Sequence, residues 1–176
     1  MFKKFSKRFN KILITGGAGF IGGNLISKLL KETDCKIFNI DKMGYASDES
    51  NLIKLKKEIK KQNADFGFAF DGDGDRLGVV NNKLQLMPGD ILTTFLAQSI
   101  SDKKNPVILD VKSSQKCKNF LEDLGYKVII WKTGHSNIKK KMKKINSKFA
   151  GEMSGHIFFG DKYYGYDDAI YSSIRF

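Results

Sequence analysis

The chain has 176 residues, 41% of them hydrophobic, so it can bury a core and does not have the composition of a disordered protein. Its formal net charge is +12, but only three of its 31 basic residues are arginines, which favours a lysine-rich solvated surface over a nucleic-acid-binding face. Cys35 and Cys117 show no metal-type spacing, and no apolar run is long enough for a membrane span. We therefore expect a cytoplasmic protein without nucleic-acid or membrane partners.

Short apolar runs alternate with amphipathic stretches along the whole chain, a pattern typical of parallel βαβ units and an α/β fold. The predicted strands are Lys11–Thr15, Lys36–Asp41, Asp65–Phe70, Leu77–Val80, Val107–Asp110, Lys127–Trp131 and Phe149–Gly151. The predicted helices are Ile21–Lys31, Asn51–Gln62, Gly89–Ser101, Gln115–Leu124 and Ser136–Ile145. In the second helix, Leu52, Leu55 and Ile59 recur at helical spacing and predict one apolar face.

A glycine-rich turn follows the first predicted strand. Gly16, Gly19 and Gly22 can bring backbone N–H groups close to a pyrophosphate, and Asp41 ends the next strand where a carboxylate can accept ribose hydroxyl groups. Residues 1–50 resemble the opening of extended short-chain dehydrogenases, in particular nucleotide-sugar 4,6-dehydratases and epimerases. The resemblance implies a Rossmann-like segment with NAD as its cofactor. The catalytic Tyr-x-x-x-Lys of that family has no counterpart downstream, so its chemistry is not expected.

Three aspartates follow the strand Asp65–Phe70 directly. Asp71, Asp73 and Asp75 repel one another unless a cation lies among them, and their hard oxygen atoms favour Mg²⁺. A calcium-binding EF-hand loop requires Gly at its sixth position and Glu at its twelfth, where this chain has Arg76 and Asn82. We therefore predict a magnesium site, with the planar cation of Arg76 beside it for a phosphate or carboxylate group.

Three later loops carry polar side chains, and each follows a predicted strand where open α/β sheets bind ligands. Lys112 and His135 can transfer protons and offset phosphoryl charge. Glu152, Ser154 and His156 lie in the Gly-bounded stretch Gly-Glu-Met-Ser-Gly-His, where Glu152 and Ser154 can hydrogen-bond neighbouring sugar hydroxyls. Taken alone each residue is ordinary, and only their combination indicates a sugar-phosphate site.

The stretch Asp-Gly-Asp-Gly-Asp-Arg and these three loops together resemble the α-D-phosphohexomutase superfamily, and most closely its phosphomannomutase/phosphoglucomutase branch, over residues 63–175. The resemblance implies that Asp71, Asp73 and Asp75 hold Mg²⁺ beside a phosphoserine, with Arg76 next to the phosphoryl group. It implies that the Glu152–His156 loop reads the 3- and 4-hydroxyls of the sugar. The expected substrates are hexose phosphates of the mannose or glucose 1-/6-phosphate class.

Three segments are predicted: a truncated Rossmann-like segment at 1–50, part of a phosphohexomutase second domain at 51–87, and a third domain at 88–176. The family surrounds one cleft with four domains, and we expect this chain to lack the phosphoserine domain and the phosphate-binding fourth domain. Accordingly, we expect no mutase turnover from it, which turnover dependent on Mg²⁺ and a bisphosphate primer would contradict. The alternatives are a module that binds NAD or a nucleotide sugar, and an inactive product of gene rearrangement.

Overall fold

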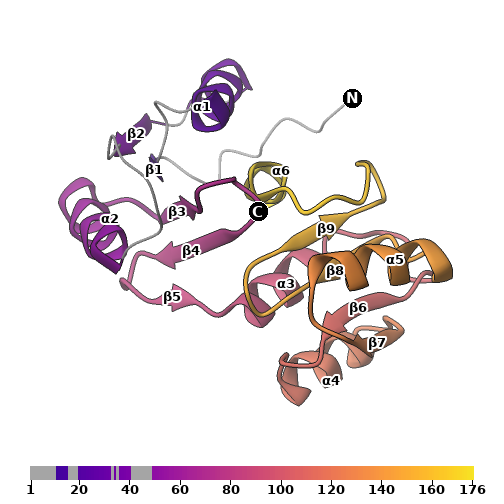
Figure 1. The fold of residues 1–176 in the computed structure, drawn as a ribbon. Helices are drawn as coiled ribbons and strands as arrows, with labels where there is room; N and C mark the ends of the chain where they lie inside the picture. The colour runs from indigo at the N-terminus through magenta and orange to yellow at the C-terminus, as the bar shows by residue number, and fades with distance from the viewer. Residues whose placement is uncertain (1–10, 16–19, 33, 35, 41–48) are drawn as a thin grey trace. The chain divides into compact units, whose positions relative to one another are not determined.

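The computed structural model describes residues 11–15, 20–32, 34, 36–40 and 49–176, and in it the chain forms two compact units. The first unit comprises residues 1–74 and 78–87, and the second comprises residues 75–77 and 88–176. Each unit contains a β-sheet with helices packed against it, which confirms the predicted α/β class (Figure 1). None of the helices within these described ranges is long and apolar enough to cross a membrane.

The sheet of the first unit has the strand order β2-β1-β3-β4-β5. Its strands are β1 (Lys11–Thr15), β2 (Lys36–Ile40), β3 (Phe66–Phe70), β4 (Leu77–Asn81) and β5 (Leu86–Met87), and its helices are α1 (Phe20–Glu32) and α2 (Glu49–Gln62). β1 pairs in parallel with both β2 and β3, whereas β4 and β5 form an antiparallel pair. The strands before and after residue 50 therefore lie in the same sheet.

The apolar face of α2 packs against this sheet. Leu55 and Ile59, both on the predicted face, are buried in a cluster with Leu13 and Val80 of the neighbouring strands. A Cβ atom at Gly67 of β3 would lie only 2.7 Å from the Cδ1 atom of Ile59. The glycine thus allows the helix to approach the sheet closely, and this spacing determines how α2 covers the first unit.

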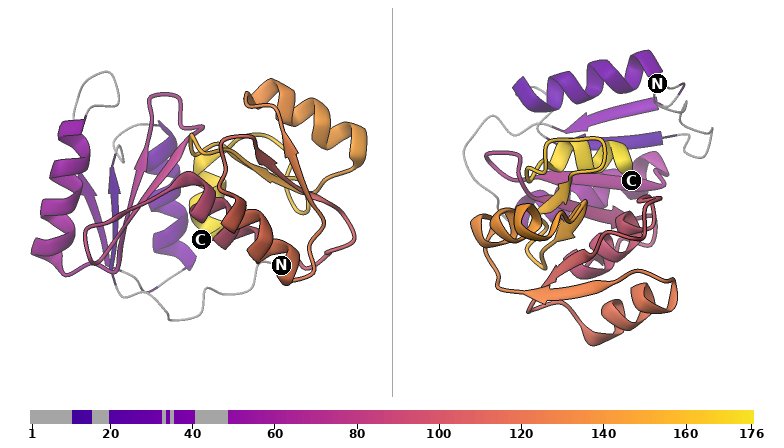
Figure 2. Two further views of the ribbon diagram at one scale, coloured as in Figure 1. Left: turned by 90° about the horizontal axis from the view of Figure 1, so that it is seen from below. Right: turned by 90° about the vertical axis from the view of Figure 1, so that its right-hand side faces the viewer.

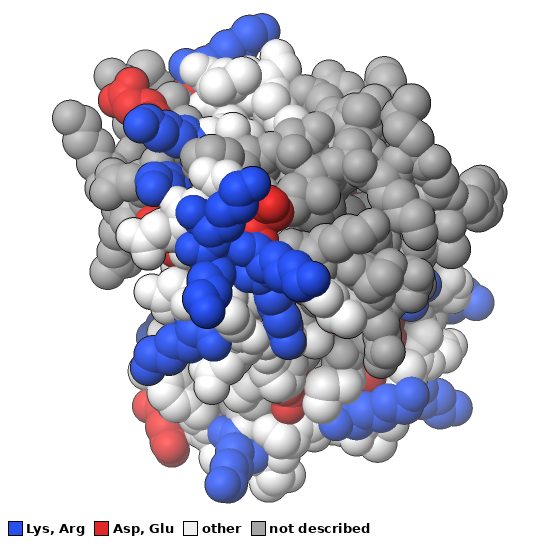
Figure 3. Space-filling view, turned by 90° about the vertical axis from the view of Figure 1, so that its left-hand side faces the viewer, with Lys and Arg blue, Asp and Glu red and all other residues white. Residues whose placement is uncertain are grey.

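The other face of α2 carries lysines. Lys57, Lys60 and Lys61 are exposed to solvent, and Lys61 forms an i,i+3 ion pair with Glu58 at 3.7 Å. Figure 3 looks onto the side of the molecule where α2 lies in Figure 1, and Lys and Arg side chains gather there with few acidic ones among them. An amphipathic helix with a solvated lysine face accounts for part of the positive charge of the chain.

The sheet of the second unit has the strand order β7-β6-β8-β9. Its strands are β6 (Val107–Asp110), β7 (Val128–Trp131), β8 (Phe149–Gly151) and β9 (Ile157–Phe159), and its helices are α3 (Gly89–Ala97), α4 (Gln115–Asp123), α5 (His135–Ile145) and α6 (Ala169–Arg175). β6 pairs in parallel with both β7 and β8, and β9 runs antiparallel to β8. Helices α3 and α4 lie on one face of this sheet and α5 on the other (Figure 2).

Two layers of packing hold these helices on the sheet. On the α5 side, the core cluster is made of Ile108, Ile138, Met142, Ala150 and Phe158. On the α3 side, a Cβ atom at Gly151 would lie 2.2 Å from the Oγ1 atom of Thr93, so β8 and α3 approach more closely there than any larger residue permits. Both helices therefore pack tightly against β8, the strand that leads into the Glu152–His156 loop.

The parallel strands β6, β7 and β8 end at the same edge of the sheet, so the loops that follow them are neighbours. Lys112 follows β6, His135 begins α5 after β7, and Glu152 follows β8 directly. Ser114 caps α4 by accepting a hydrogen bond from the N–H of Cys117 at 3.3 Å, which fixes where the first loop ends. The predicted polar loops of residues 110–156 thus share one edge, as the strand pattern indicates.

Candidate functional site

The loop between β3 and β4 brings its three carboxylates together. Asp71, Asp73 and Asp75 each offer an oxygen atom, and these atoms lie within 4.8 Å of one another. Gly74 has a φ of 74°, and its N–H donates to the carbonyl oxygen of Asp71 at 3.3 Å, so the backbone turns tightly between the second and third aspartates. This compact set of hard oxygen donors fits a Mg²⁺ ion, as the spacing of the aspartates predicts.

Residues 75–77 continue from this loop and belong to the second unit. Arg76 forms an isolated β-bridge with His156, and the N–H of Leu77 donates to the carbonyl oxygen of Gly155 at 3.1 Å. The Arg76 side chain is about half exposed, with its Nε atom 3.8 Å from the Oδ1 atom of Asp75. Backbone pairing therefore holds the third aspartate beside the Glu152–His156 loop.

Glu152 is buried, with only 1% of its side chain exposed. Its Oε1 atom accepts the backbone N–H of Gly134 at 2.5 Å, and its Oε2 atom lies 2.9 Å from the Nδ1 atom of His156. Burial by itself would raise the pKa of this carboxyl group, but the hydrogen bonds from His156 and Gly134 outweigh it and lower the pKa. Glu152 is thus an ionised acceptor held between two loops.

His156 lies between Glu152 and Asp75. Its Nδ1 atom is 2.9 Å from both the Oε2 atom of Glu152 and the Oγ atom of Ser154, and its Nε2 atom is 3.4 Å from the Oδ2 atom of Asp75. The hydrogen bond to Glu152 raises the pKa of His156 against the opposing effect of burial, and the charge of Asp75 adds to the increase. The predicted sugar-binding residues are therefore one connected group, and it reaches the metal loop through Asp75.

His135 lies beside this group at the start of α5. Its ring stacks on that of His156 with the centroids 5.9 Å apart, and its Nδ1 atom lies 3.3 Å from the Oδ2 atom of Asp167. Asp167 also accepts a hydrogen bond from the Nζ atom of Lys139 at 2.9 Å. Roughly half of the His135 side chain is exposed, so its ring can reach a ligand at the edge of the sheet.

Lys112 is exposed on the turn after β6, at the same sheet edge. The structure places it near the other loops through the strand arrangement alone. The residue that joins these loops is its neighbour Asp110, which is buried and accepts hydrogen bonds from the Oγ atom of Ser113 at 2.8 Å, the Oγ1 atom of Thr133 at 3.3 Å and the N–H of Met153 at 3.3 Å. One carboxylate thereby ties together the loops that follow β6, β7 and β8.

Sequence reasoning did not identify Asp110, Lys139 or Asp167 as part of the site. Asp110 is the last residue of a predicted strand, and its burial could have been inferred from its position at the end of an apolar run. Asp167 and Lys139 are 28 positions apart and meet only in the folded chain. No local pattern distinguishes these two from surface charges.

The glycine-rich turn lies mostly outside the described residues. Gly16, Gly19 and Asp41 belong to the undescribed part of the chain, and Gly22 lies in α1. The structure does contain the parallel β1–α1–β2 unit that the sequence predicts there. The expectation of bound NAD finds no support in the structure, and the role of these four residues stays a prediction.

The chain matches two models of one protein family. The model described as phosphoglucomutase/phosphomannomutase, alpha/beta/alpha domain III, matches residues 88–176, and that of alpha/beta/alpha domain II matches residues 1–85. The second match includes the whole segment for which a dehydrogenase resemblance was inferred, and that resemblance is not supported. A strand, a glycine turn and a helix recur in many α/β folds, so the motif did not distinguish between families.

Named relatives agree with these matches. The phosphomannomutase/phosphoglucomutase of Pseudomonas putida is 48% identical over 128 residues, which cover 71% of this chain and 27% of the relative. That of Pseudomonas syringae pv. tomato is 46% identical over 168 residues, which cover 91% of this chain and 36% of the relative. The chain thus spans between a quarter and two fifths of the length of these relatives.

Solved structures show the same similarity. A phosphoglucomutase/phosphomannomutase family protein from Burkholderia thailandensis has a TM-score of 0.83 and 33% identity, with 94% of this chain and 38% of that chain covered. A protein described as a putative phosphomannomutase from Thermus thermophilus has a TM-score of 0.79 at 21% identity, which shows the same fold. The chain belongs to the phosphoglucomutase/phosphomannomutase family, whose α/β/α domains II and III it matches.

Proposed function

We propose that this chain is the metal-binding and sugar-recognising part of a Mg²⁺-dependent phosphomannomutase/phosphoglucomutase. The reaction is the intramolecular transfer of a phosphoryl group on a hexose phosphate of the mannose or glucose class. Both relatives named above carry the two activities in their names, and the chain spans less than two fifths of their length. For that reason the activity is a property proposed for the longer protein, and binding is the property proposed for this chain.

One contact carries the proposal. The Nε2 atom of His156 lies 3.4 Å from the Oδ2 atom of Asp75, so within the second unit the third carboxylate of the metal loop lies beside the polar loop after β8. A hexose phosphate has hydroxyls at one end and a dianionic phosphate at the other. A buried acceptor next to a cation site suits such a molecule, because the two ends need opposite electrostatic environments.

Glu152 and Ser154 bind the sugar end of the substrate in this proposal. Glu152 is ionised and fixed by Gly134 and His156, and its remaining lone pairs can accept hydrogen bonds from sugar hydroxyls. Ser154 is exposed and offers a hydroxyl that can both donate and accept. A substrate without those hydroxyls would form fewer hydrogen bonds with Glu152 and Ser154, so the pair selects for the sugar.

The phosphate end is served by cations and a metal ion. Arg76 can donate two parallel hydrogen bonds to phosphate oxygens, while Lys112 and His135 can offset charge or move a proton at the sheet edge. A Mg²⁺ ion held by Asp71, Asp73 and Asp75 would neutralise charge on the transferring phosphoryl oxygens. We propose these roles together with a cytoplasmic location, which cell fractionation would test.

Calorimetry with the 176-residue chain tests the proposal. We expect Mg²⁺ to bind the unmodified chain and Asp73→Asn to weaken that binding, because one of three carboxylates then loses its charge. In the presence of Mg²⁺, glucose 1-phosphate or mannose 1-phosphate should bind the unmodified chain. Glu152→Gln should lower the affinity for the sugar phosphate and leave the affinity for Mg²⁺ unchanged. The binding of inorganic phosphate, which lacks the sugar, should not change with Glu152→Gln.

Two results would contradict this function. The metal assignment fails if Mg²⁺ binds equally to the unmodified chain and to Asp73→Asn. The sugar assignment fails if both hexose phosphates bind no better than inorganic phosphate. A titration with NAD belongs to the same experiment, since uptake of NAD without uptake of hexose phosphate would favour the nucleotide-binding alternative.

A further inference from the structure

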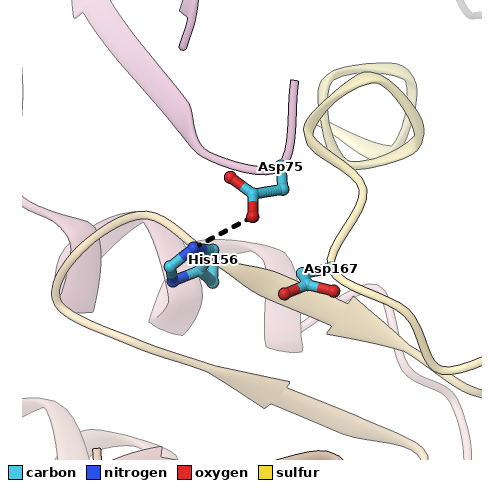
Figure 4. A group of neighbouring side chains, drawn as sticks. All are labelled: Asp75, His156 and Asp167. Atoms are coloured by element: carbon cyan, nitrogen blue, oxygen red, sulfur yellow. Dashed lines mark ion pairs between the residues drawn. The ribbon is translucent and has the colours of Figure 1, made fainter. Parts of the chain in front are cut away.

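A second group of metal-type ligands lies next to the three aspartates. Asp75, His156 and Asp167 each offer one ligand atom, and these atoms lie within 4.8 Å of one another. Figure 4 shows the Asp75 carboxylate facing the imidazole of His156, with Asp167 on the neighbouring loop before α6. All three residues belong to the second unit, and only Asp75 is shared with the predicted magnesium ligands.

Backbone pairing fixes the three positions. The bridge between Arg76 and His156 and the bond from the N–H of Leu77 to Gly155 hold Asp75 beside His156. A bridge between Phe158 and Asp167 holds the third ligand beside β9. The group is therefore preorganised by main-chain contacts from three segments, as a metal site built on rigid elements requires.

The imidazole of His156 is oriented for ligation by its Nε2 atom. The Nδ1 atom is engaged by the Oε2 atom of Glu152 at 2.9 Å, and the Glu152 side chain is almost fully buried. Histidines that bind metals commonly donate their other ring nitrogen to a carboxylate, which sets the tautomer and increases the basicity of the ligating nitrogen. Glu152 stands in that position relative to His156.

The distance between the first two ligand atoms fits a tetrahedral ion. Ligands at about 2.0–2.1 Å from a tetrahedral zinc lie about 3.4 Å from one another. The Nε2 atom of His156 and the Oδ2 atom of Asp75 are 3.4 Å apart. A direct charge-assisted hydrogen bond between them would be shorter, about 2.7–2.9 Å.

Asp167 supplies an independent indication. Its side chain is only 8% exposed, and its Oδ2 atom is buried without a hydrogen bond among the described residues. The other oxygen, Oδ1, accepts a hydrogen bond from Lys139 at 2.9 Å, and His135 lies 3.3 Å from Oδ2 as an ion pair that does not meet hydrogen-bond geometry, so Oδ2 is the oxygen left to a cation. A buried carboxylate oxygen in this state is costly to desolvate, and a bound cation would relieve that cost.

We propose that Asp75, His156 and Asp167 bind a divalent transition-metal ion of the zinc class. One imidazole nitrogen and two carboxylate oxygens suit Zn²⁺, whereas Mg²⁺ prefers oxygen ligands alone. The proposal goes beyond the phosphohexomutase function and does not depend on it. Because Asp75 belongs to both groups, the zinc-class ion and Mg²⁺ compete for one carboxylate.

Zinc titration of the 176-residue chain, with a chromophoric chelator as competitor, tests the site. His156→Gln and Asp167→Asn should each weaken Zn²⁺ binding by more than the roughly 10- to 100-fold that loss of an outer partner causes. Asp71→Asn is the matched control, because it removes a carboxylate from the neighbouring group and not from this one. Asp71→Asn should weaken the binding of Mg²⁺ and leave the binding of Zn²⁺ unchanged. Asp167→Asn should weaken the binding of Zn²⁺ and leave the binding of Mg²⁺ unchanged.

A measurement on the unmodified chain avoids dependence on folded variants. The chain has only two histidines, so long-range ¹H–¹⁵N spectra can follow each ring nitrogen separately. On addition of Zn²⁺, we expect the Nε2 resonance of His156 to shift strongly while its Nδ1 atom stays protonated. The proposal is overturned if neither nitrogen of His156 responds, or if Zn²⁺ binds equally well to the unmodified chain, His156→Gln and Asp167→Asn. Loss of Mg²⁺ binding alone would contradict the proposed function and leave this site intact.

Discussion

The substitution Gly89→Ala tests how α3 positions the Glu152–His156 loop. Gly89 is the first residue of α3, and a Cβ atom there would lie 2.3 Å from the carbonyl oxygen of Met153 and 2.9 Å from that of Glu152. Ordinary van der Waals contact of a Cβ atom begins at 3.4 Å, so the helix and the loop must separate by about 1 Å. Both contacts are backbone atoms and cannot be relieved by a change of rotamer.

The expected cost follows from this overlap. Overpacking destabilises a protein by about 1–3 kcal/mol, and the greater helix propensity of alanine stabilises it by up to about 1 kcal/mol. We expect Gly89→Ala to lower the free energy of unfolding of the second unit by about 1–2 kcal/mol. It should also weaken hexose-phosphate binding, because the Glu152 backbone is displaced while its side chain is unchanged.

Urea unfolding followed by tryptophan fluorescence measures this effect. Trp131 is the only tryptophan of the chain and lies in β7, so the signal reports on the second unit. Gly160→Ala is the control, since its nearest neighbour would be 3.7 Å away, and we expect a change within about 0.5 kcal/mol. The packing argument is refuted if Gly89→Ala and Gly160→Ala have the same unfolding midpoint and the same ligand affinity.

Two further predictions concern stability. The hydrogen bond to Asp168, with burial adding to its effect, raises the pKa of Tyr163 to about 12. The bond therefore stabilises the fold fully below pH 10, and this stabilisation is lost as the pH rises through about 12. In an alkaline absorbance titration the last phenol should ionise near pH 12, and Tyr163→Phe should remove that step; a step that persists would contradict the assignment. Arg175 donates from two nitrogens to Asp161 at 3.0 Å each and is mostly buried, so Arg175→Ala should cost about 3 kcal/mol in urea unfolding. If Arg175→Ala changed the free energy of unfolding by only about 0.5 kcal/mol, as is usual for exposed ion pairs, the Arg175–Asp161 pair would contribute little to stability.

Most helices and strands could be predicted because their residues carry strong local patterns. β1, β6 and β8 begin and end at the predicted residues, since each is a short apolar run bounded by polar residues or glycine. α3 ends at Ala97 rather than at the predicted Ser101. β5, β9 and α6 were not predicted as elements, because runs of two, three and seven residues are formed by pairing and packing rather than by their own periodicity.

The site could be predicted in part for a similar reason. Asp71, Asp73 and Asp75 are close in sequence, and an alternation of aspartate and glycine leaves few structures in which they are far apart. Asp110 shows the limit of this reasoning, because its three bonds go to loops that follow three different strands. A residue whose partners are 23 and 43 positions away has no local signature.

The sequence by itself determined the α/β class, the order of most elements and the proximity of the three carboxylates after β3, because each depends on spacings of a few residues. Only the tertiary structure decided that Asp75 faces His156, that Glu152 is buried between Gly134 and His156, and that Asp167 joins them. Three of those contacts join residues far apart in the chain: Gly134 and Glu152 are 18 positions apart, Asp75 and His156 are 81 apart, and Asp75 and Asp167 are 92 apart. They form where parallel strands and backbone bridges bring loop ends together. Contacts of this kind depend on how strands are ordered in a sheet, which hydrophobic spacing along the chain does not specify.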